Sequence, residues 1–188
     1  MRFVFPFKKD QSAILTSQFG MRTHPITGKQ KLHKGIDIVI DDREITSTAD
    51  GKVIQIGLDP SYSAGRYVLI DHGEGYTSRY FHCERILVKE GQTVKTGDLI
   101  AIQGTTGHST GEHLHFELRK GSKAFDPFEV IKNGGNGGGK LRHVEDQEHW
   151  GEKHFESLNK KGITVNERRF DDLMTRAEVM ALIDRATN

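Results

Sequence analysis

Two short stretches of the chain combine histidine with carboxylate at spacings that suit a metal site. His33 and Asp37 are four residues apart, and His113, His115 and Glu117 alternate along the second stretch. On an extended strand, even spacing places such side chains on one face. Hydrolytic zinc takes three nitrogen or oxygen ligands from the protein and keeps a fourth position for water. His33, Asp37 and one histidine of the second stretch satisfy this count, and the other histidine would lie near the water as a general base.

The residues around these two stretches lead to two further predictions, on the space for an ion and on the partner of a ligand histidine. Gly35, between His33 and Asp37, is expected to leave open space for an ion above the sheet. A ligand histidine needs a hydrogen-bonded partner. Glu117 is not expected to be that partner of His115, because side chains two apart on a strand seldom meet.

A further histidine, His82, closes a predicted strand and is a third candidate for the site. Cys83 follows it directly, which raises the possibility of a cysteine–histidine nucleophile. Adjacent residues of a strand point to opposite faces, so the pair would not meet. Cys83 is therefore expected to be a small buried hydrophobic residue. The other six histidines carry no predicted chemistry, and those in apparent turns, His24, His72 and His108, are expected to be solvated. A place along the groove of the site is the alternative for His24 and His108.

The composition excludes several classes of protein. The 188 residues include 27 Lys and Arg against 26 Asp and Glu, and this balance argues against a nucleic-acid binder. A single cysteine excludes a disulfide framework and a cysteine-rich zinc finger. No stretch is apolar enough for membrane insertion, and residues 1–9 become charged too early for a signal peptide.

The elements that must position the candidate residues look like strands. Short runs rich in β-branched and aromatic residues are separated by Gly, Asp, Asn or Pro, and no long helical period interrupts them. We therefore predict a mainly β domain with an antiparallel sheet or sandwich architecture. The predicted strands are Gly35 to Ile40, Gly51 to Ile56, Tyr67 to Ile70, Thr77 to Phe81, Leu99 to Ile102 and His113 to Leu118.

A glycine-rich run divides the chain. It predicts a domain over residues 1–132, a flexible linker over 133–142 and a small helical module over 143–188. In the module, one helix is expected to run from Trp150 to about Lys161. A second helix begins at Thr175, where Thr175 and Glu178 have the spacing of a capping box.

The motifs around the candidate site resemble the LytM/lysostaphin-type M23 zinc metallopeptidases. His33-Lys34-Gly35-Ile36-Asp37 and Gly111-Glu112-His113-Leu114-His115-Phe116 carry the resemblance. It continues, in order, through Ser17 to Arg22, Ala49 to Val53, Val68 to Gly73 and Val88 to Asp98, and ends at Phe125-Asp126-Pro127.

The resemblance implies specific roles for these residues. His33, Asp37 and His115 would be the ligands of Zn²⁺, and His113 and His82 would be the catalytic histidines. It also implies a zinc-dependent endopeptidase that hydrolyses peptide bonds of bacterial peptidoglycan, in the stem peptide or its cross-link. His113 would serve as general base and His82 as oxyanion stabiliser or acid, although the sequence permits the reverse assignment.

Two departures from the family pattern concern the substrate. Gly65-Arg66-Tyr67 stands where many members have Gly-Asn before the strand. No tyrosine lies between Gly20 and His33, where members specific for glycine bridges often carry one. The second departure favours a stem peptide or a direct cross-link over a pentaglycine bridge.

The C-terminal segment weakly resembles one surface-layer-homology-like unit of the kind found in phage endolysins, through stretches such as His149-Trp150-Gly151 and Arg169-Phe170-Asp171-Asp172. This resemblance implies cell-wall targeting, with a helical appendage for folding or dimerisation as the alternative. A substrate outside the membrane and no visible signal peptide together predict a phage lysin, released through a holin pore or carried on the virion. An export signal that lies outside the 188 residues is the alternative.

Two other functions compete with hydrolysis. A non-catalytic M23-like module that binds the cell wall or activates a partner would be expected to lack ligands, whereas every ligand is present here. A biotinyl- or lipoyl-like carrier would need a lysine at an exposed hairpin tip in a characteristic setting. The hairpin from Val88 to Ile102 has the general form but not that lysine.

Overall fold

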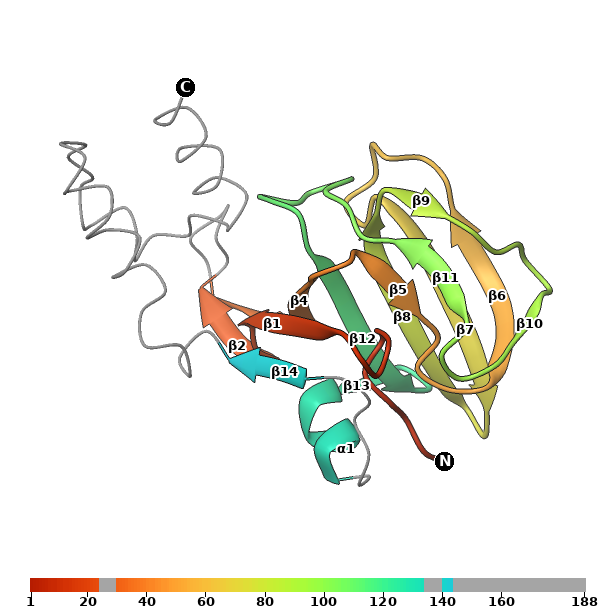
Figure 1. Ribbon diagram of the computed structural model, residues 1–188. Helices are drawn as coiled ribbons and strands as arrows, with labels where there is room; N and C mark the ends of the chain where they lie inside the picture. Colours follow the sequence, from red (N-terminus) through yellow and green to blue (C-terminus); the bar gives the residue numbers. More distant parts are fainter. Residues whose placement is uncertain (24–29, 134–139, 144–188) are drawn as a thin grey trace, which may run out of the picture.

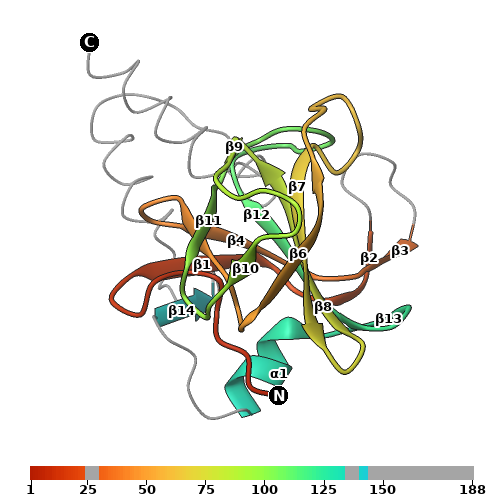
Figure 2. The same ribbon diagram turned by 90° about the vertical axis from the view of Figure 1, so that its right-hand side faces the viewer.

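The computed structural model describes residues 1–23, 30–133 and 140–143, which form three β-sheets and one short helix (Figures 1 and 2). The predicted mainly β, antiparallel fold is confirmed. The predicted C-terminal helices lie outside the described residues. The elements are β1 Ser12–Ser17, β2 Gly20–Thr23, β3 Gln30–His33, β4 Ile36–Ile40, β5 Glu44–Thr46, β6 Gly51–Gly57, β7 Arg66–Gly73, β8 Tyr76–Cys83, β9 Arg85–Ile86, β10 Thr93–Val94, β11 Leu99–Ile102, β12 Leu114–Lys120, β13 Lys123–Phe125, α1 Pro127–Asn133 and β14 Lys140–His143.

The largest sheet has nine strands and forms the frame of the molecule. Its order is β10-β6-β7-β8-β12-β4-β1-β14, with β13 paired to β12. A three-stranded sheet, β5-β11-β9, lies in front of the large sheet in the view of Figure 1. The two-stranded sheet β2-β3 stands apart. All six predicted strands are present, as β4, β6, β7, β8, β11 and β12.

The core explains why the central strands alternate in polarity. Leu114, Phe116 and Leu118 of β12 are fully buried, and they belong to one hydrophobic cluster with Tyr80 of β8 and Ile100 of β11. Burying each large apolar side chain contributes about 1.5–3 kcal/mol. This energy fixes the register of β12, because a slip by one residue would turn its apolar face outward. The intervening residues of β12, which include His115 and Glu117, must then face away from the core.

Residues 140–143 form a strand, whereas the sequence predicted a linker over 133–142. Asn133 closes α1, and Lys140–His143 forms β14, which pairs in parallel with β1. The sequence did not predict this strand, because Lys140–His143 contains one apolar residue and directly follows the glycine run. Figures 1 and 2 both place α1 beside the N-terminal segment, where the rings of Phe5 and Phe128 lie 6.2 Å apart.

His72 is a buried residue of β7, so the expectation of a solvated turn histidine was wrong. Its Nδ1 donates to the carbonyl of Asp50 at 2.8 Å, and its Nε2 accepts from Ser78 Oγ at 2.7 Å. Ser78 in turn lies 3.0 Å from the hydroxyl of the buried Tyr80. Each buried polar atom along this chain has a partner, which is the condition for placing such groups inside a domain.

No helix among the described residues is long and apolar enough to cross a membrane.

Candidate metal centre

Strand pairing brings the three predicted metal ligands together. In the antiparallel pair of β4 and β12, Asp37 lies directly opposite His115. His33 closes β3, the neighbouring hairpin strand. His115 Nδ1 lies 2.7 Å from Asp37 Oδ1, and His33 Nε2 lies 3.1 Å from that oxygen and 3.0 Å from His115 Nδ1. All three donor atoms therefore lie within 4.8 Å of one another.

The connection between His33 and Asp37 corrects two expectations. The two residues do not share one strand, because β3 ends at His33 and β4 begins at Ile36. Gly35 does not leave open space either. A Cβ at Gly35 would lie 2.3 Å from the carbonyl oxygen of Phe116 and 3.0 Å from Glu117 Cγ. Glycine is needed here because the backbone of β12 occupies that space.

The two ligand histidines present their lone pairs to the same point. His33 Nδ1 lies 2.6 Å from the carbonyl oxygen of Gln18, to which it must donate. That leaves the lone pair of His33 Nε2 facing Asp37. His115 Nε2 lies 3.3 Å from Glu117 Oε1, so its Nδ1 is the corresponding acceptor. Three electron-rich atoms that converge in this way repel one another unless a cation lies among them. Two imidazole nitrogens and one carboxylate oxygen are a donor set that suits Zn²⁺.

The acid–base properties of the ligands reflect the same convergence. Burial raises the pKa of Asp37, but the His115 and His33 imidazoles beside its Oδ1 outweigh burial and hold that pKa well below its usual range. Burial lowers the pKa of His115, but the bonds to Asp37 and Glu117 outweigh it and raise that pKa to about 9. Without a metal, a proton on His115 thus supplies the positive charge that the site attracts.

Glu117 contacts His115, so the expectation that it would not was wrong. Its other carboxylate oxygen accepts a hydrogen bond from Arg119 Nε at 2.7 Å, which holds the carboxylate beside the imidazole. Glu117 is 5% exposed, so this ion pair is shielded from water. A long side chain anchored from one side can reach along its own strand. This contact fixes the orientation of a ligand ring.

Arg22 is a site residue that the sequence analysis did not single out. It lies on β2, and its Nη2 donates to Asp37 Oδ2 at 3.1 Å. The two carboxylate oxygens of Asp37 therefore have different partners, with Oδ1 facing the two histidines. Pairing of β2 with β3, which sets Arg22 opposite Lys31, brings Arg22 to this side of the site. No short-range spacing in the sequence signals the contact.

His113 and His82, the two histidines predicted to be catalytic, lie next to the cluster of His33, Asp37 and His115. Their ring centroids are 4.9 Å apart, and His113 Nε2 lies 3.8 Å from Asp37 Oδ1. The Nδ1 of His113 is 2.9 Å from the carbonyl oxygen of Gly111, and the Nδ1 of His82 is 2.8 Å from that of Thr106. Both rings must therefore donate from Nδ1, which leaves the lone pair on Nε2.

Burial keeps both of these histidines neutral near pH 7. Burial, with a smaller contribution from His113, lowers the pKa of His82 to about 4. Burial also lowers the pKa of His113 below its ordinary value. A neutral imidazole with a free Nε2 lone pair is a proton acceptor, so both residues have the state that a general base requires.

The backbone at His82 has an uncommon conformation. Its φ is 64°, in the left-handed region that side chains other than glycine rarely adopt. The simple alternation of β8 is therefore broken at its end, and both His82 and Cys83 are buried. Cys83 is fully buried, which confirms the prediction of a small buried hydrophobic residue, and burial raises the pKa of its thiol to about 12. Strained residues of this kind concentrate at functional sites.

Comparison with known proteins identifies relatives over this region. The sequence model described as Peptidase family M23 matches residues 31–127, which include the three converging ligands and both further histidines. The protein named Peptidoglycan DD-endopeptidase ShyB, from Vibrio cholerae, is 43% identical over 115 residues, or 61% of this chain and 26% of its own length. The chain matches about a quarter of the length of such curated relatives.

Solved structures share the fold as well as the sequence. A zinc-containing peptidase from Vibrio cholerae superposes with a TM-score of 0.60 at 41% identity, covering 67% of this chain and 39% of that chain. The catalytic domain of the prophage-encoded M23 protein EnpA, from Enterococcus faecalis, superposes with a TM-score of 0.57 at 29% identity. That match covers 67% of this chain and 95% of the other.

Proposed function

Because the chain belongs to peptidase family M23, we propose that it is a zinc-dependent endopeptidase that hydrolyses peptide bonds of bacterial peptidoglycan. The observation that carries the proposal is the convergence of His33, Asp37 and His115 beside two neutral histidines. The similarity to a relative named as a peptidoglycan DD-endopeptidase supports the substrate class.

His33 Nε2, Asp37 Oδ1 and His115 Nδ1 would hold the zinc ion. Zinc bound there would lower the pKa of a water molecule toward neutrality and polarise the carbonyl of the scissile bond. Gln18 and Glu117 keep the two ligand rings in the tautomers that this binding requires. Arg22 holds the second oxygen of Asp37, which leaves Oδ1 as the oxygen that would face the metal.

His113 is the residue that accepts the proton of the attacking water. Its Nε2 carries the lone pair and lies 3.8 Å from the ligand atom Asp37 Oδ1, so it faces the place where water is activated. His82 stands beside it, and once its Nε2 has taken up a proton from solvent it could stabilise the negative charge that develops on the carbonyl oxygen or protonate the leaving amine. The carbonyls of Gly111 and Thr106 accept from Nδ1 of these two rings and so leave both Nε2 atoms available for proton transfer.

The test of this proposal is the His113→Ala variant. We expect it to bind zinc in the same ratio as the wild type, because His113 is not a ligand, and to lose hydrolysis of purified peptidoglycan. His108→Ala, which removes another histidine of the same connecting segment, is the matched control and should retain activity. Full activity of His113→Ala would contradict the role of His113. An inactive wild-type protein that binds peptidoglycan would favour a non-catalytic wall-binding module.

We propose the stem peptide or a direct cross-link as the bond cleaved, rather than a pentaglycine bridge. The absence of a tyrosine between Gly20 and His33 supports this proposal. Digestion of purified peptidoglycans that contain either direct or pentaglycine cross-links tests it, with the fragments identified by mass. Fragments from the direct cross-link alone are expected. Release of glycine oligomers would contradict the proposal.

We further propose that the protein acts at the bacterial cell wall as a lytic enzyme of phage type, reaching it through a holin pore or on a virion. The similarity to a prophage-encoded M23 protein supports this origin. Residues 143–188 would target the wall, as their surface-layer-homology-like motifs suggest. Sedimentation of the His113→Ala protein with intact walls, with and without residues 144–188, tests the targeting. Equal binding of both forms would exclude it.

A further inference from the structure

Arg43 has a backbone conformation that its side chain does not favour. Among the described residues, positive φ angles outside glycine occur at Arg43 (65°), Glu74 (53°) and His82 (64°). Arg43 lies in the turn between β4 and β5, in a conformation that glycine adopts without strain. Strain of this kind persists where the surroundings require the particular residue. The contacts of the Arg43 side chain therefore need an explanation.

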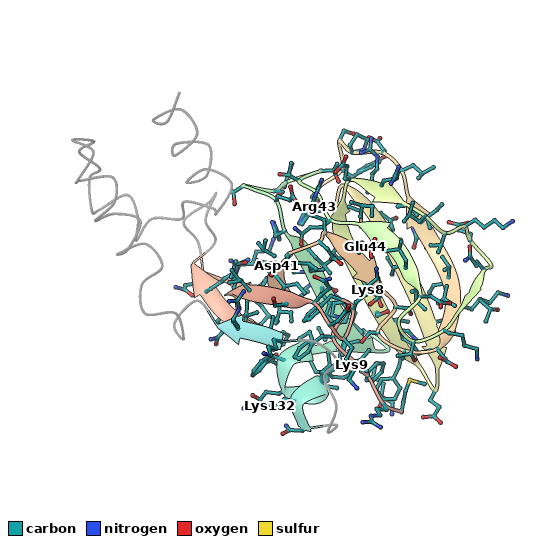
Figure 3. All side chains as sticks on the ribbon, viewed as in Figure 1. Lys8, Lys9, Asp41, Arg43, Glu44 and Lys132 are labelled. Carbon is teal, nitrogen blue, oxygen red and sulfur yellow. The ribbon has the colours of Figure 1, made fainter. Side chains whose placement is uncertain are left out.

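The Arg43 guanidinium joins three groups from different parts of the chain. Its Nη2 donates to the carbonyl oxygen of Gln103 at 3.0 Å and also to Glu84 Oε2. Its Nε lies 2.6 Å from Glu112 Oε1. The carbonyl oxygen of Arg43 accepts from the amide of Gln103 at 2.8 Å, so Arg43 holds Gln103 from both sides. Figure 3 labels Arg43 next to Glu44, on the side of the molecule away from Lys132 of α1.

Two of these partners lie within two residues of a site histidine, and the third begins the connection that leads to one. Glu84 follows His82 by two residues, and Glu112 immediately precedes His113. Gln103 opens the connection from β11 to β12, and that connection ends at His113.

The same connection also orients the second histidine. It carries Thr106, whose carbonyl oxygen holds the ring of His82. It is packed closely on the segment after His82, since a Cβ at Gly104 would lie 2.5 Å from the amide nitrogen of Glu84. One guanidinium therefore spans both ends of the connection and the segment that follows His82.

We propose that Arg43 is a positioning residue, which fixes the separation of His82 and His113 by holding Glu84, Gln103 and Glu112 together. The proposal rests on the proposed peptidase function of these histidines. Arg43 and Glu84 are 42% and 55% exposed, and exposed ion pairs add little to stability. The contribution of Arg43 therefore lies in the geometry of the histidine pair and not in the stability of the fold.

The Arg43→Gly variant separates these two contributions. Glycine relieves the positive φ and removes the guanidinium, so the melting temperature should not fall. Because small displacements of catalytic groups cost large factors in rate, kcat on directly cross-linked peptidoglycan fragments should fall roughly tenfold. KM and the zinc-to-protein ratio should stay unchanged. Glu74→Gly is the matched control, since it relieves the same kind of strain far from the site, and it should keep wild-type kcat.

Arg43→Lys keeps the charge but loses the planar guanidinium that donates to Glu84 and Gln103 and forms an ion pair with Glu112. Its kcat should therefore stay close to that of Arg43→Gly. If Arg43→Gly fails to fold, Glu112→Gln removes one of the bridged groups from the other side and should lower kcat without changing zinc content. Wild-type kcat in Arg43→Gly, or in Glu112→Gln where the glycine variant does not fold, would overturn the proposal.

A second measurement does not depend on activity. In the metal-free protein, the imidazole nitrogen resonances of His82 and His113 should broaden or split in Arg43→Gly, while those of His72 stay unchanged. This result would support the positioning role even if the wild type cleaved no peptidoglycan, which would refute only the proposed function. Unchanged His82 and His113 resonances in Arg43→Gly would overturn the positioning role.

Discussion

The two ring nitrogens of each site histidine have different partners, and this division determines what each ring can do. In His33 and His115, the nitrogen that faces away from the cluster bonds to Gln18 or Glu117, which turns the other nitrogen into a metal donor. In His82 and His113, a backbone carbonyl holds Nδ1. Nε2 is then left as a proton acceptor. Under the proposed function, the same residue type would thus serve in metal binding and in proton transfer, according to its second hydrogen bond.

The contact between Glu117 and His115 leads to a prediction at the level of one residue. Glu117→Gln keeps the size of the side chain and removes its charge, so the His115 ring loses a charge-assisted partner. We expect the affinity for zinc to fall about tenfold, the lower end of the range for residues that orient ligands. Competition with a chromophoric chelator measures this affinity.

Glu129→Gln on α1 is the control for that experiment, because Glu129 bonds to Asn133 and lies outside the metal site. It should bind zinc as the wild type does. Equal zinc affinity in Glu117→Gln and the wild type would mean that the neutral amide orients His115 as well as the carboxylate.

The site residues that could be predicted lie in recognisable sequence motifs, whereas the missed ones reach the site only through the folded structure. His33, Asp37 and His115 stand in motifs whose spacing and residue types are visible in the chain. The partners that set the tautomers are largely backbone carbonyls, such as that of Thr106, and any residue type can supply a carbonyl. Arg22 reaches Asp37 through the pairing of strands distant in sequence. Such contacts depend on tertiary structure.

At the scale of elements, the turn from β3 to β4 decides whether the ligands converge. Gly35→Ala would place a Cβ 2.3 Å from a backbone oxygen of β12, which cannot rotate away. The turn must then move off β12 and separate His33 from His115. Overpacking of this kind costs about 1–3 kcal/mol in the free energy of unfolding. Urea denaturation of the metal-free protein should show this loss, and zinc affinity should fall with it.

Gly121→Ala is a useful comparison for that variant. Gly121 has a positive φ of 57° but open space around its Cβ position, so alanine there strains the backbone without a clash. It should lower stability and leave zinc affinity unchanged. If Gly35→Ala behaved in the same way, its effect would be local strain rather than displacement of the ligands.

The hairpin of β7 and β8 should make stability depend on pH through His72. Burial lowers the pKa of His72 below 6.5, so the unfolded chain takes up this proton before the folded protein does. Stability is then greatest above pH 6.5 and falls as the pH drops toward the lowered pKa. In His72→Gln, which cannot titrate there, the free energy of unfolding should fall less between pH 7 and 5. Parallel curves for the two proteins would contradict this origin.

The strands were predictable because each central strand alternates between a core face and an outer face, and this period survives in the sequence. The places near the site where the strands are interrupted could not be predicted in this way. His33 and Asp37 have the spacing of one strand, yet the chain turns between them because β12 approaches Gly35. His82 lies where the alternation of β8 ends in a left-handed residue. Both exceptions occur beside the candidate metal centre, where geometry competes with regular structure.

At the scale of the molecule, the nine-stranded sheet acts as the rigid support of the site. Its central strands β4, β8 and β12 hold Asp37, His82 and His115, and their inner faces belong to one core. His33 comes from the separate β2-β3 hairpin. The metal would therefore join a small sheet to the large one. Because the metal would bind the folded chain and not the unfolded one, its binding free energy would add to the stability of the folded state.

The outer edge of the same sheet gives the last prediction, which concerns where the β-sheet domain ends. β14 pairs with β1, so residues 140–143 belong to the sheet although they follow the glycine run. A chain of residues 1–143 should therefore keep the stability of the large sheet and its activity on soluble fragments. A chain of residues 1–133 loses the backbone hydrogen bonds of β14, each worth about 0.5–1.5 kcal/mol, and exposes the edge of β1. It should unfold at lower urea concentration and aggregate more readily. Equal urea midpoints for the two chains would mean that β14 adds nothing to the domain, and that its boundary lies at the glycine run.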